Sequence, residues 1–201
     1  NGTHSAMAYI GSLAGHVTVS DAINDPAIDA FLTSMLHDEI IPSLHASEGI
    51  DFDDYVATLK DRFRNPEIRH LLDQIAMDGS QKIPQRILGI LRHQLQHGNS
   101  IQACCLAIAA WMRYVMATDE HGNSYIVQDP LASQLKQISD NANGDATLLV
   151  MNYLAVKDIF STDLINQTEL TEQLTHWLSE LLNHGVIATL IKFKTNRESN
   201  L

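Results

Sequence analysis

The sequence predicts an all-α protein that forms a single multi-helical domain over residues 1–201. The first observation is that apolar residues recur at three- and four-residue intervals through most of the chain, which is the spacing of one buried helix face. The second is that residues favouring helix starts and ends, above all Asx-Pro pairs and single glycines, separate these stretches. No internal repeat, heptad run or low-complexity linker divides the chain.

Helix starts are expected at three Asx-Pro pairs, which are Asp25-Pro26, Asn65-Pro66 and Asp129-Pro130. The helix after Asp25 should end at Pro42. Further apolar stripes predict helices within 55–63, 68–75, 87–95, 101–117, 148–154 and 170–182. Strand-like composition is confined to 125–127 and 186–193. The polar tail, about 194–201, is expected to fray.

The balance of 13 Lys and Arg against 24 Asp and Glu gives a formal net charge of -11. This charge opposes attraction to nucleic acids and anionic membranes, so an anionic substrate would need a local cationic pocket. The longest apolar run, 103–112, is about half the ~20 residues of a membrane-spanning helix. It contains Cys104 and Cys105, whose adjacency would strain a disulfide between them. We therefore expect a cytoplasmic protein with no nucleic-acid or membrane partner.

Asn1 and His4 form the first candidate pair. A helix that begins here would place them about 60° apart on one face. An amide and an imidazole in that arrangement can hydrogen-bond a substrate hydroxyl and the oxygen that gains charge when a carbonyl is reduced. The alternative is that Asn1 only caps the helix and His4 is a surface residue.

The polar turn at 78–86, between two apolar helices, holds the second candidate. Pro84 is expected in the first turn of a helix, where backbone amides attract anions. Lys82 and Arg86 are four residues apart, so one helix face would offer two cations to a carboxylate. The alternative is a loop with solvated charges.

Other chemistry has no support in the sequence. His93 and His97 have a spacing seen in zinc sites, but Gln94 stands where a zinc protease needs its general-base Glu, and no third ligand is evident, so no metal is predicted. The chain has neither a Gly-x-Ser-x-Gly elbow nor a Gly-x-Gly-x-x-Gly nucleotide fingerprint.

Three segments in order, 1–11, 62–70 and 74–86, resemble the polyol-specific long-chain dehydrogenases, and the resemblance covers essentially all 201 residues. It implies that the chain is the C-terminal substrate domain of a two-domain enzyme whose N-terminal Rossmann domain is absent. That domain would bind NAD, and the reaction would be a metal-independent hydride transfer to or from a secondary alcohol. The absence of an initial Met agrees with a fragment of a longer protein.

The resemblance also implies roles for individual residues. Asn1 and His4 match the family motif Lys-x-x-x-x-Asn-x-x-His, so the general-base lysine would lie five residues before Asn1. In the family the Asn stabilises the developing alkoxide and the His binds a neighbouring hydroxyl. Lys82 matches a lysine that reaches the substrate, and Gln74 and Arg86 are further substrate-binding candidates.

Gln74 stands where mannitol dehydrogenases tend to have Arg, and the segment 74–86 is more similar to the fructuronate reductase branch. That branch interconverts D-fructuronate and D-mannonate. Mannitol 2-dehydrogenase or tagaturonate reductase activity is the alternative within the family, and a stand-alone helical binding module is the alternative outside it. The isolated chain is expected to be inactive, and to self-associate if it exposes the apolar surface that faces the Rossmann domain.

Overall fold

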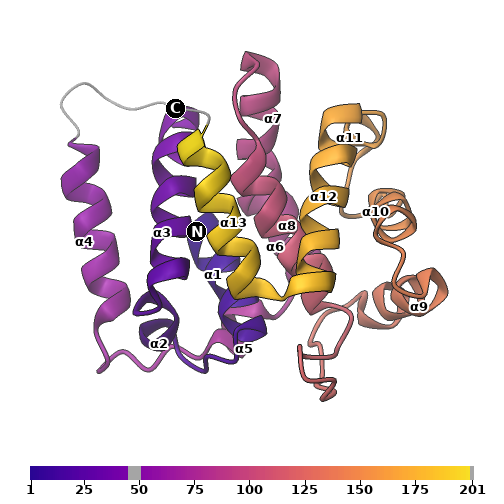
Figure 1. The fold of residues 1–201 in the computed structure, drawn as a ribbon, viewed down its shortest axis with the longest axis horizontal. Coiled ribbons are helices and arrows are strands. Elements are labelled where there is room, and N and C mark those ends of the chain that lie inside the picture. The colour runs from indigo at the N-terminus through magenta and orange to yellow at the C-terminus, as the bar shows by residue number, and fades with distance from the viewer. Residues whose placement is uncertain (45–50, 200–201) are drawn as a thin grey trace.

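The computed structural model describes residues 1–44 and 51–199, and in these ranges the secondary structure is helical apart from two isolated bridges, Thr18–Leu71 and Thr118–Ser124. The all-α prediction is thereby confirmed (Figure 1). The elements are α1 (Gly2–Leu13), α2 (Val19–Ile23), α3 (Pro26–Ser34), the π-helix η1 (Met35–Ile40), the 3₁₀ turn η2 (Ile41–Ser43), α4 (Phe52–Arg64), α5 (Leu72–Ala76), α6 (Gly79–Arg86), α7 (Leu88–His97), α8 (Gln102–Tyr114), α9 (Ala132–Ala142), α10 (Ala146–Leu154), α11 (Thr162–Ile165), α12 (Thr168–His184) and α13 (Val186–Ser199).

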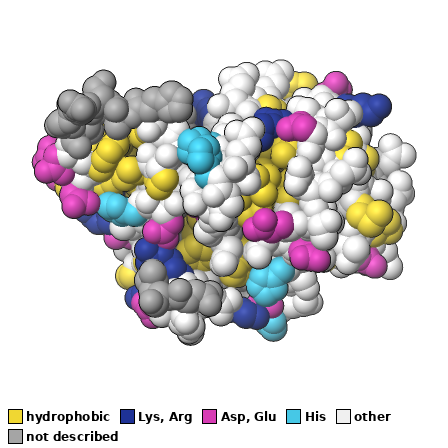
Figure 2. Space-filling view, turned by 90° about the horizontal axis from the view of Figure 1, so that it is seen from above, with side chains coloured by type: hydrophobic (Ala, Val, Ile, Leu, Met, Phe, Trp, Pro, Cys, Tyr) yellow, Lys and Arg dark blue, Asp and Glu magenta, His cyan; other side chains and the backbone are white. Residues whose placement is uncertain are grey.

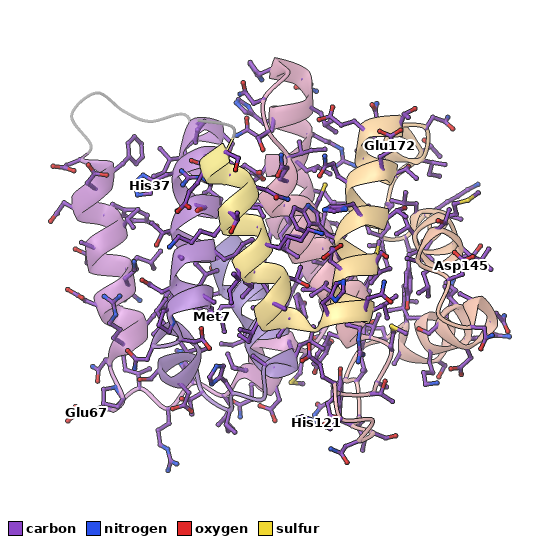
Figure 3. All side chains as sticks on the ribbon, in the orientation of Figure 1. Met7, His37, Glu67, His121, Asp145 and Glu172 are labelled. Carbon is purple, nitrogen blue, oxygen red and sulfur yellow. The ribbon has the colours of Figure 1, made fainter. Side chains whose placement is uncertain are left out.

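Helices α1 and α8 form the centre of the fold. They pack against each other, α12 covers α8, and α4 and the α9–α10 pair lie at opposite edges (Figure 1). Every residue from Ala103 to Tyr114 is buried, which explains why the longest apolar run of the sequence belongs to a helix enclosed on all sides. Met7 of α1 lies inside the molecule, whereas Glu67 and His121 lie at its lower border (Figure 3).

Several sequence signals act as predicted. Asp25 caps α3, because its Oδ1 accepts hydrogen bonds from the amides of Ala27 (2.8 Å) and Ile28 (3.4 Å). Gly98 ends α7 with a positive φ of 67°, a conformation that glycine adopts without steric cost. The helical backbone does not stop at Pro42, however, because it continues as η1 and η2 through Ser43.

Other expectations are wrong. Asn65-Pro66 begins no helix: α4 ends at Arg64, and the Asn65 side chain accepts from the Glu67 amide at 3.0 Å, which closes a turn. The strand-like segment 186–193 belongs to helix α13, since packing against α3 and α12 overrides its β-branched composition.

The tail that the sequence led us to expect as frayed is helical as far as Ser199. Helix α13 runs to that residue, and Arg197 pairs with Asp38 through Nε–Oδ2 (2.5 Å) and Nη2–Oδ1 (2.9 Å) contacts. This bidentate pair ties the last turn of the helix to η1. Residues 200–201 of the predicted tail lie outside the described residues.

Glu39 is the buried carboxylate of the core, with 1% of its surface exposed. The π-helix η1 brings it to the start of α8, where its Oε1 and Oε2 accept hydrogen bonds from the amides of Ala103 (2.7 Å) and Cys104 (2.8 Å). It therefore caps a helix whose second residue, Ala103, lies 64 residues further along the chain. Burial raises the pKa of Glu39 above its ordinary value of 4.5, although these hydrogen bonds oppose the shift.

We expect Glu39 to make folding depend on pH. Because its pKa is higher in the folded chain than in the unfolded chain, its contribution to stability is greatest below pH 4.5 and falls as the pH rises through the folded-state pKa. The free energy of unfolding of the wild type and of Glu39→Gln is measured by urea denaturation at acidic and at neutral pH. As the pH rises, the wild type should lose stability relative to Glu39→Gln. A difference that is constant with pH would contradict this assignment.

Candidate substrate site

A cavity of about 300 Å³ lies at the N-terminal end of α1. Its lining comprises Asn1, His4, His70, Leu71, Gln74, Ile75, Lys82 and Arg86. All the residues that the sequence singled out as catalytic or substrate-binding candidates thus meet at one place, although they come from α1, α5 and α6. Their chemical roles remain predictions.

The two cations of α6 are held by neighbouring elements. Lys82 Nζ donates a hydrogen bond to the Ile75 carbonyl at 3.0 Å, and Arg86 Nη1 donates to Ser5 Oγ at 3.1 Å. Both side chains are half-buried and line the cavity. Their four-residue spacing places them on one face of the helix. The cavity therefore has a preformed cationic wall.

The turn before α6 sets the position of this wall. Asp78 has a left-handed φ of 55°, and its amide donates to the Gln128 carbonyl at 2.9 Å. Gly79 follows in contact with the Trp111 indole, because a Cβ built on it would lie 2.4 Å from Trp111 Nε1. Only glycine fits this position without displacing the core.

Two expectations about α6 are wrong. The helix begins at Gly79, so Pro84 is its sixth residue instead of a first-turn residue, and the helix ends soon after it, at Arg86. The amide of Ser80 at the helix start donates to Asp129 Oδ2 at 2.7 Å. Because a carboxylate of the chain already binds this helix start, which lies outside the cavity lining, its amides are not the anion site that the sequence suggested.

The pKa values of His4 and Lys82 are both lower than their ordinary values. Burial is the main cause that lowers the pKa of His4 to about 4, and the nearby groups of His70, Arg86 and Arg62 lower it further. His4 is therefore neutral near pH 7 and offers one ring nitrogen as donor and one as acceptor. Burial and Arg86 also lower the pKa of Lys82, against the opposing effect of Asp78.

His70 is the site residue that sequence reasoning missed. It lies between α4 and α5, where the sequence predicted a helix from residue 68 but α5 begins only at Leu72, and its backbone carbonyl accepts a hydrogen bond from the Val19 amide at 3.0 Å. The signal that could have found it is its place inside the 62–70 motif. The alternative in which Asn1 caps α1 through its side chain is not observed, since that side chain makes no capping hydrogen bond.

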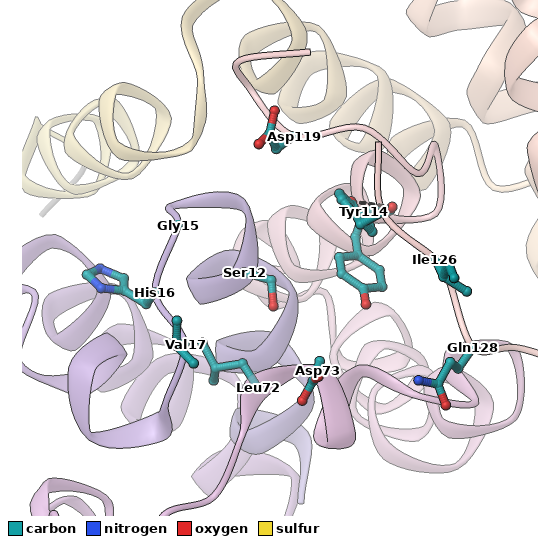
Figure 4. A pocket seen from close by; sticks show the side chains of 11 residues that line it. Ser12, Gly15, His16, Val17, Leu72, Asp73, Tyr114, Asp119, Ile126 and Gln128 are labelled. Carbon is teal, nitrogen blue, oxygen red and sulfur yellow. Dashed lines mark hydrogen bonds between the residues drawn. The ribbon is translucent and has the colours of Figure 1, made fainter. Parts of the chain in front are cut away.

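A second cavity, of about 540 Å³, lies between the end of α1, α5 and the segment 117–128 (Figure 4). Its lining comprises Ser12, Gly15, His16, Val17, Leu72, Asp73, Tyr114, Asp119, Tyr125, Ile126 and Gln128. The carboxylates of Asp73 and Asp119 make it unfavourable for an anion, whereas none of the described residues that line the cavity around His4 and Lys82 carries a carboxylate. On the face shown in Figure 2, acidic and basic side chains are scattered among each other.

The His93 and His97 pair lies on α7 with stacked rings, 4.2 Å between centroids, and His97 Nδ1 is 2.7 Å from the His93 carbonyl oxygen. Within residues 1–44 and 51–199, no group of three or more His, Cys, Asp or Glu is placed to hold a metal ion. In the same ranges, no helix is both long and apolar enough to cross a membrane.

Comparison with known proteins places the chain in a family. The profile of the mannitol dehydrogenase C-terminal domain matches residues 1–182. The D-mannonate oxidoreductase of Escherichia coli K12 is 38% identical over 185 residues, which are 92% of this chain and 38% of that protein. The oxidoreductase YdfI of the same organism, described as uncharacterized, is 39% identical over 96% of this chain and 39% of its own length.

Among solved structures, the Pseudomonas fluorescens mannitol 2-dehydrogenase in ternary complex with NAD and D-mannitol superposes with a TM-score of 0.90 at 32% identity, over 97% of this chain and 39% of that one. The chain thus spans well under half the length of these relatives. From the family profile and these identities, the chain belongs to the mannitol dehydrogenase C-terminal domain family.

Proposed function

We propose that this chain is the substrate-binding part of an NAD-dependent dehydrogenase that interconverts D-fructuronate and D-mannonate. The observation that carries the proposal is the cavity around His4, whose described lining presents Lys82 and Arg86 and no carboxylate, in a chain with a net charge of -11. Such a cavity favours a substrate with a carboxylate over a neutral polyol. The similarity to the E. coli D-mannonate oxidoreductase supports this choice.

In this proposal each side chain has one task. Lys82 and Arg86 bind the substrate carboxylate with charge-assisted hydrogen bonds, and the Gln74 amide binds a substrate hydroxyl beside them. The Asn1 amide donates to the oxygen that gains negative charge during reduction of the ketone. Neutral His4 binds the neighbouring hydroxyl, and the proton for the new alcohol comes from the lysine that the family motif places before Asn1.

NAD, when bound by a cofactor domain, supplies or accepts the hydride. The cavity fits this arrangement because Asn1, His70 and Gln74 are exposed, so it opens to solvent on one side. A nicotinamide held by another domain would approach from that side. The present residues would bind and orient the sugar acid, and a domain closing over them would exclude water.

A substrate panel on the complete enzyme that contains this chain tests the proposal. Mannonate, altronate, mannitol and arabinitol are each assayed with NAD and with NADP, and we expect the highest kcat/KM for mannonate with NAD. A higher kcat/KM for mannitol than for either acid would overturn the sugar-acid assignment in favour of a polyol dehydrogenase. A preference for altronate would point to tagaturonate reduction.

A further inference from the structure

The ring of His4 packs directly against a phenylalanine from a different part of the chain. The centroids of the His4 and Phe63 rings are 4.4 Å apart and their planes meet at 76°, an edge-to-face contact. Phe63 is 5% exposed and belongs to α4, an edge helix whose buried residues are Val56 and Phe63. One side of the imidazole is therefore covered by an aromatic ring while the residue also lines the cavity.

The end of α4 that carries Phe63 is anchored on both sides. Asp29 of α3 contacts Lys60 Nζ through Oδ1 at 2.8 Å and Arg64 Nη2 at 3.3 Å. The Arg64 carbonyl accepts a hydrogen bond from Ser20 Oγ of α2 at 3.1 Å. These contacts flank Phe63 in sequence, so they fix the position of its ring on His4.

We propose that Phe63 is a positioning residue, which fixes the plane of the His4 imidazole toward the substrate and keeps water from its covered side. This inference rests on the proposed function, in which His4 binds a substrate hydroxyl. An edge-to-face ring contact restricts the orientation of both rings, which an aliphatic side chain of similar size does not do. This role would connect the 62–70 motif to the site, because Arg62 and His70 of the same segment also lower the pKa of His4.

Phe63 also affects the charge state of His4. The charged or titratable groups that face His4 are Arg86 on α6, and Arg62 and His70 of the 62–70 segment. All of them disfavour a protonated ring, and burial is the largest cause of the low pKa of about 4. Removing the phenyl ring hydrates His4 and should raise this pKa toward the ordinary value of 6.5.

The first experiment needs no substrate. The His4 imidazole of the complete enzyme is titrated by NMR in the wild type, Phe63→Ala, Phe63→Leu and Val56→Ala, with the His4 resonance identified by its loss in His4→Gln. Val56→Ala is the matched control, because Val56 is the other buried residue of α4 and lies seven positions before Phe63. We expect the midpoint to rise by about one pH unit or more in Phe63→Ala and to stay unchanged in Val56→Ala. Equal shifts in both, or none in the folded Phe63 variants, would overturn the proposal.

The second experiment measures mannonate oxidation by the complete enzyme. Phe63→Leu keeps the site apolar but removes the ring contact, so KM should rise about 3- to 10-fold while Val56→Ala retains the wild-type KM. An unchanged KM in Phe63→Leu would refute the positioning role. Failure of the wild type to use mannonate would count against the proposed function alone, since the titration does not depend on the substrate.

Discussion

Lys82→Met in the complete enzyme is expected to lower kcat/KM for mannonate about 100-fold, mainly through a higher KM. A charge-assisted hydrogen bond to a partly buried carboxylate contributes about 1.5–3 kcal/mol, and each 1.36 kcal/mol changes the constant tenfold. Lys82 is held in place by the Ile75 carbonyl, so its ammonium group reaches the substrate without a large loss of side-chain freedom. Steady-state kinetics with mannonate as the varied substrate measure this effect.

The control for this variant is Lys136→Met. Lys136 lies on α9, its side chain is partly exposed to solvent and pairs with Asp140, and it does not line the cavity. Its replacement should leave kcat/KM unchanged. The pKa of Lys82 is lower than the ordinary lysine value of 10.5. Lys82 should therefore lose its charge, and KM for mannonate should begin to rise, below pH 10.5. An equal loss of activity in both methionine variants would argue against a specific role for Lys82.

Gly79→Ala should lower the free energy of unfolding by about 3 kcal/mol, which is at the upper end for overpacking of a core. The new Cβ would lie 2.4 Å from Trp111 Nε1 and 2.9 Å from the Tyr9 hydroxyl oxygen. Both aromatic residues are fully buried, so neither can move without disturbing α1 or α8. Urea denaturation followed by circular dichroism gives the change.

Gly89→Ala is the matched control, because Gly89 lies in α7 and a Cβ there meets nothing within 4 Å. Alanine has a higher helix propensity than glycine, so this variant should be stabilised by up to about 1 kcal/mol. Similar stabilities for Gly79→Ala and the wild type would mean that the turn before α6 can shift away from Trp111.

The helices that the sequence predicted best are those with a local start or stop signal. The Asp25 cap and Gly98 act within a few residues, and the structure confirms both. The two failures have different causes. Asn65-Pro66 resembles a helix start, but the Asn65 side chain closes a local turn with the Glu67 amide. The segment 186–193 has strand-like residues but lies in α13, because contacts with α3 and α12 decide its structure.

In the candidate site, too, some features were predicted from the sequence and others were found only in the structure. The motif resemblance named Asn1, His4 and Lys82, and the structure adds that they line one cavity with His70, a residue that the motifs did not single out. The sequence also placed the anion-binding amides at a helix start near Pro84. Asp129, which lies far along the chain, binds the actual start of α6 instead.

The sequence by itself determined that the chain is all-α and which family motifs it carries, because helical periodicity and capping are properties of neighbouring residues. Only the tertiary structure decided that Phe63 packs on His4 and that Glu39 caps α8. These contacts join residues about 60 positions apart, and packing between helices, which no local pattern encodes, brings them together.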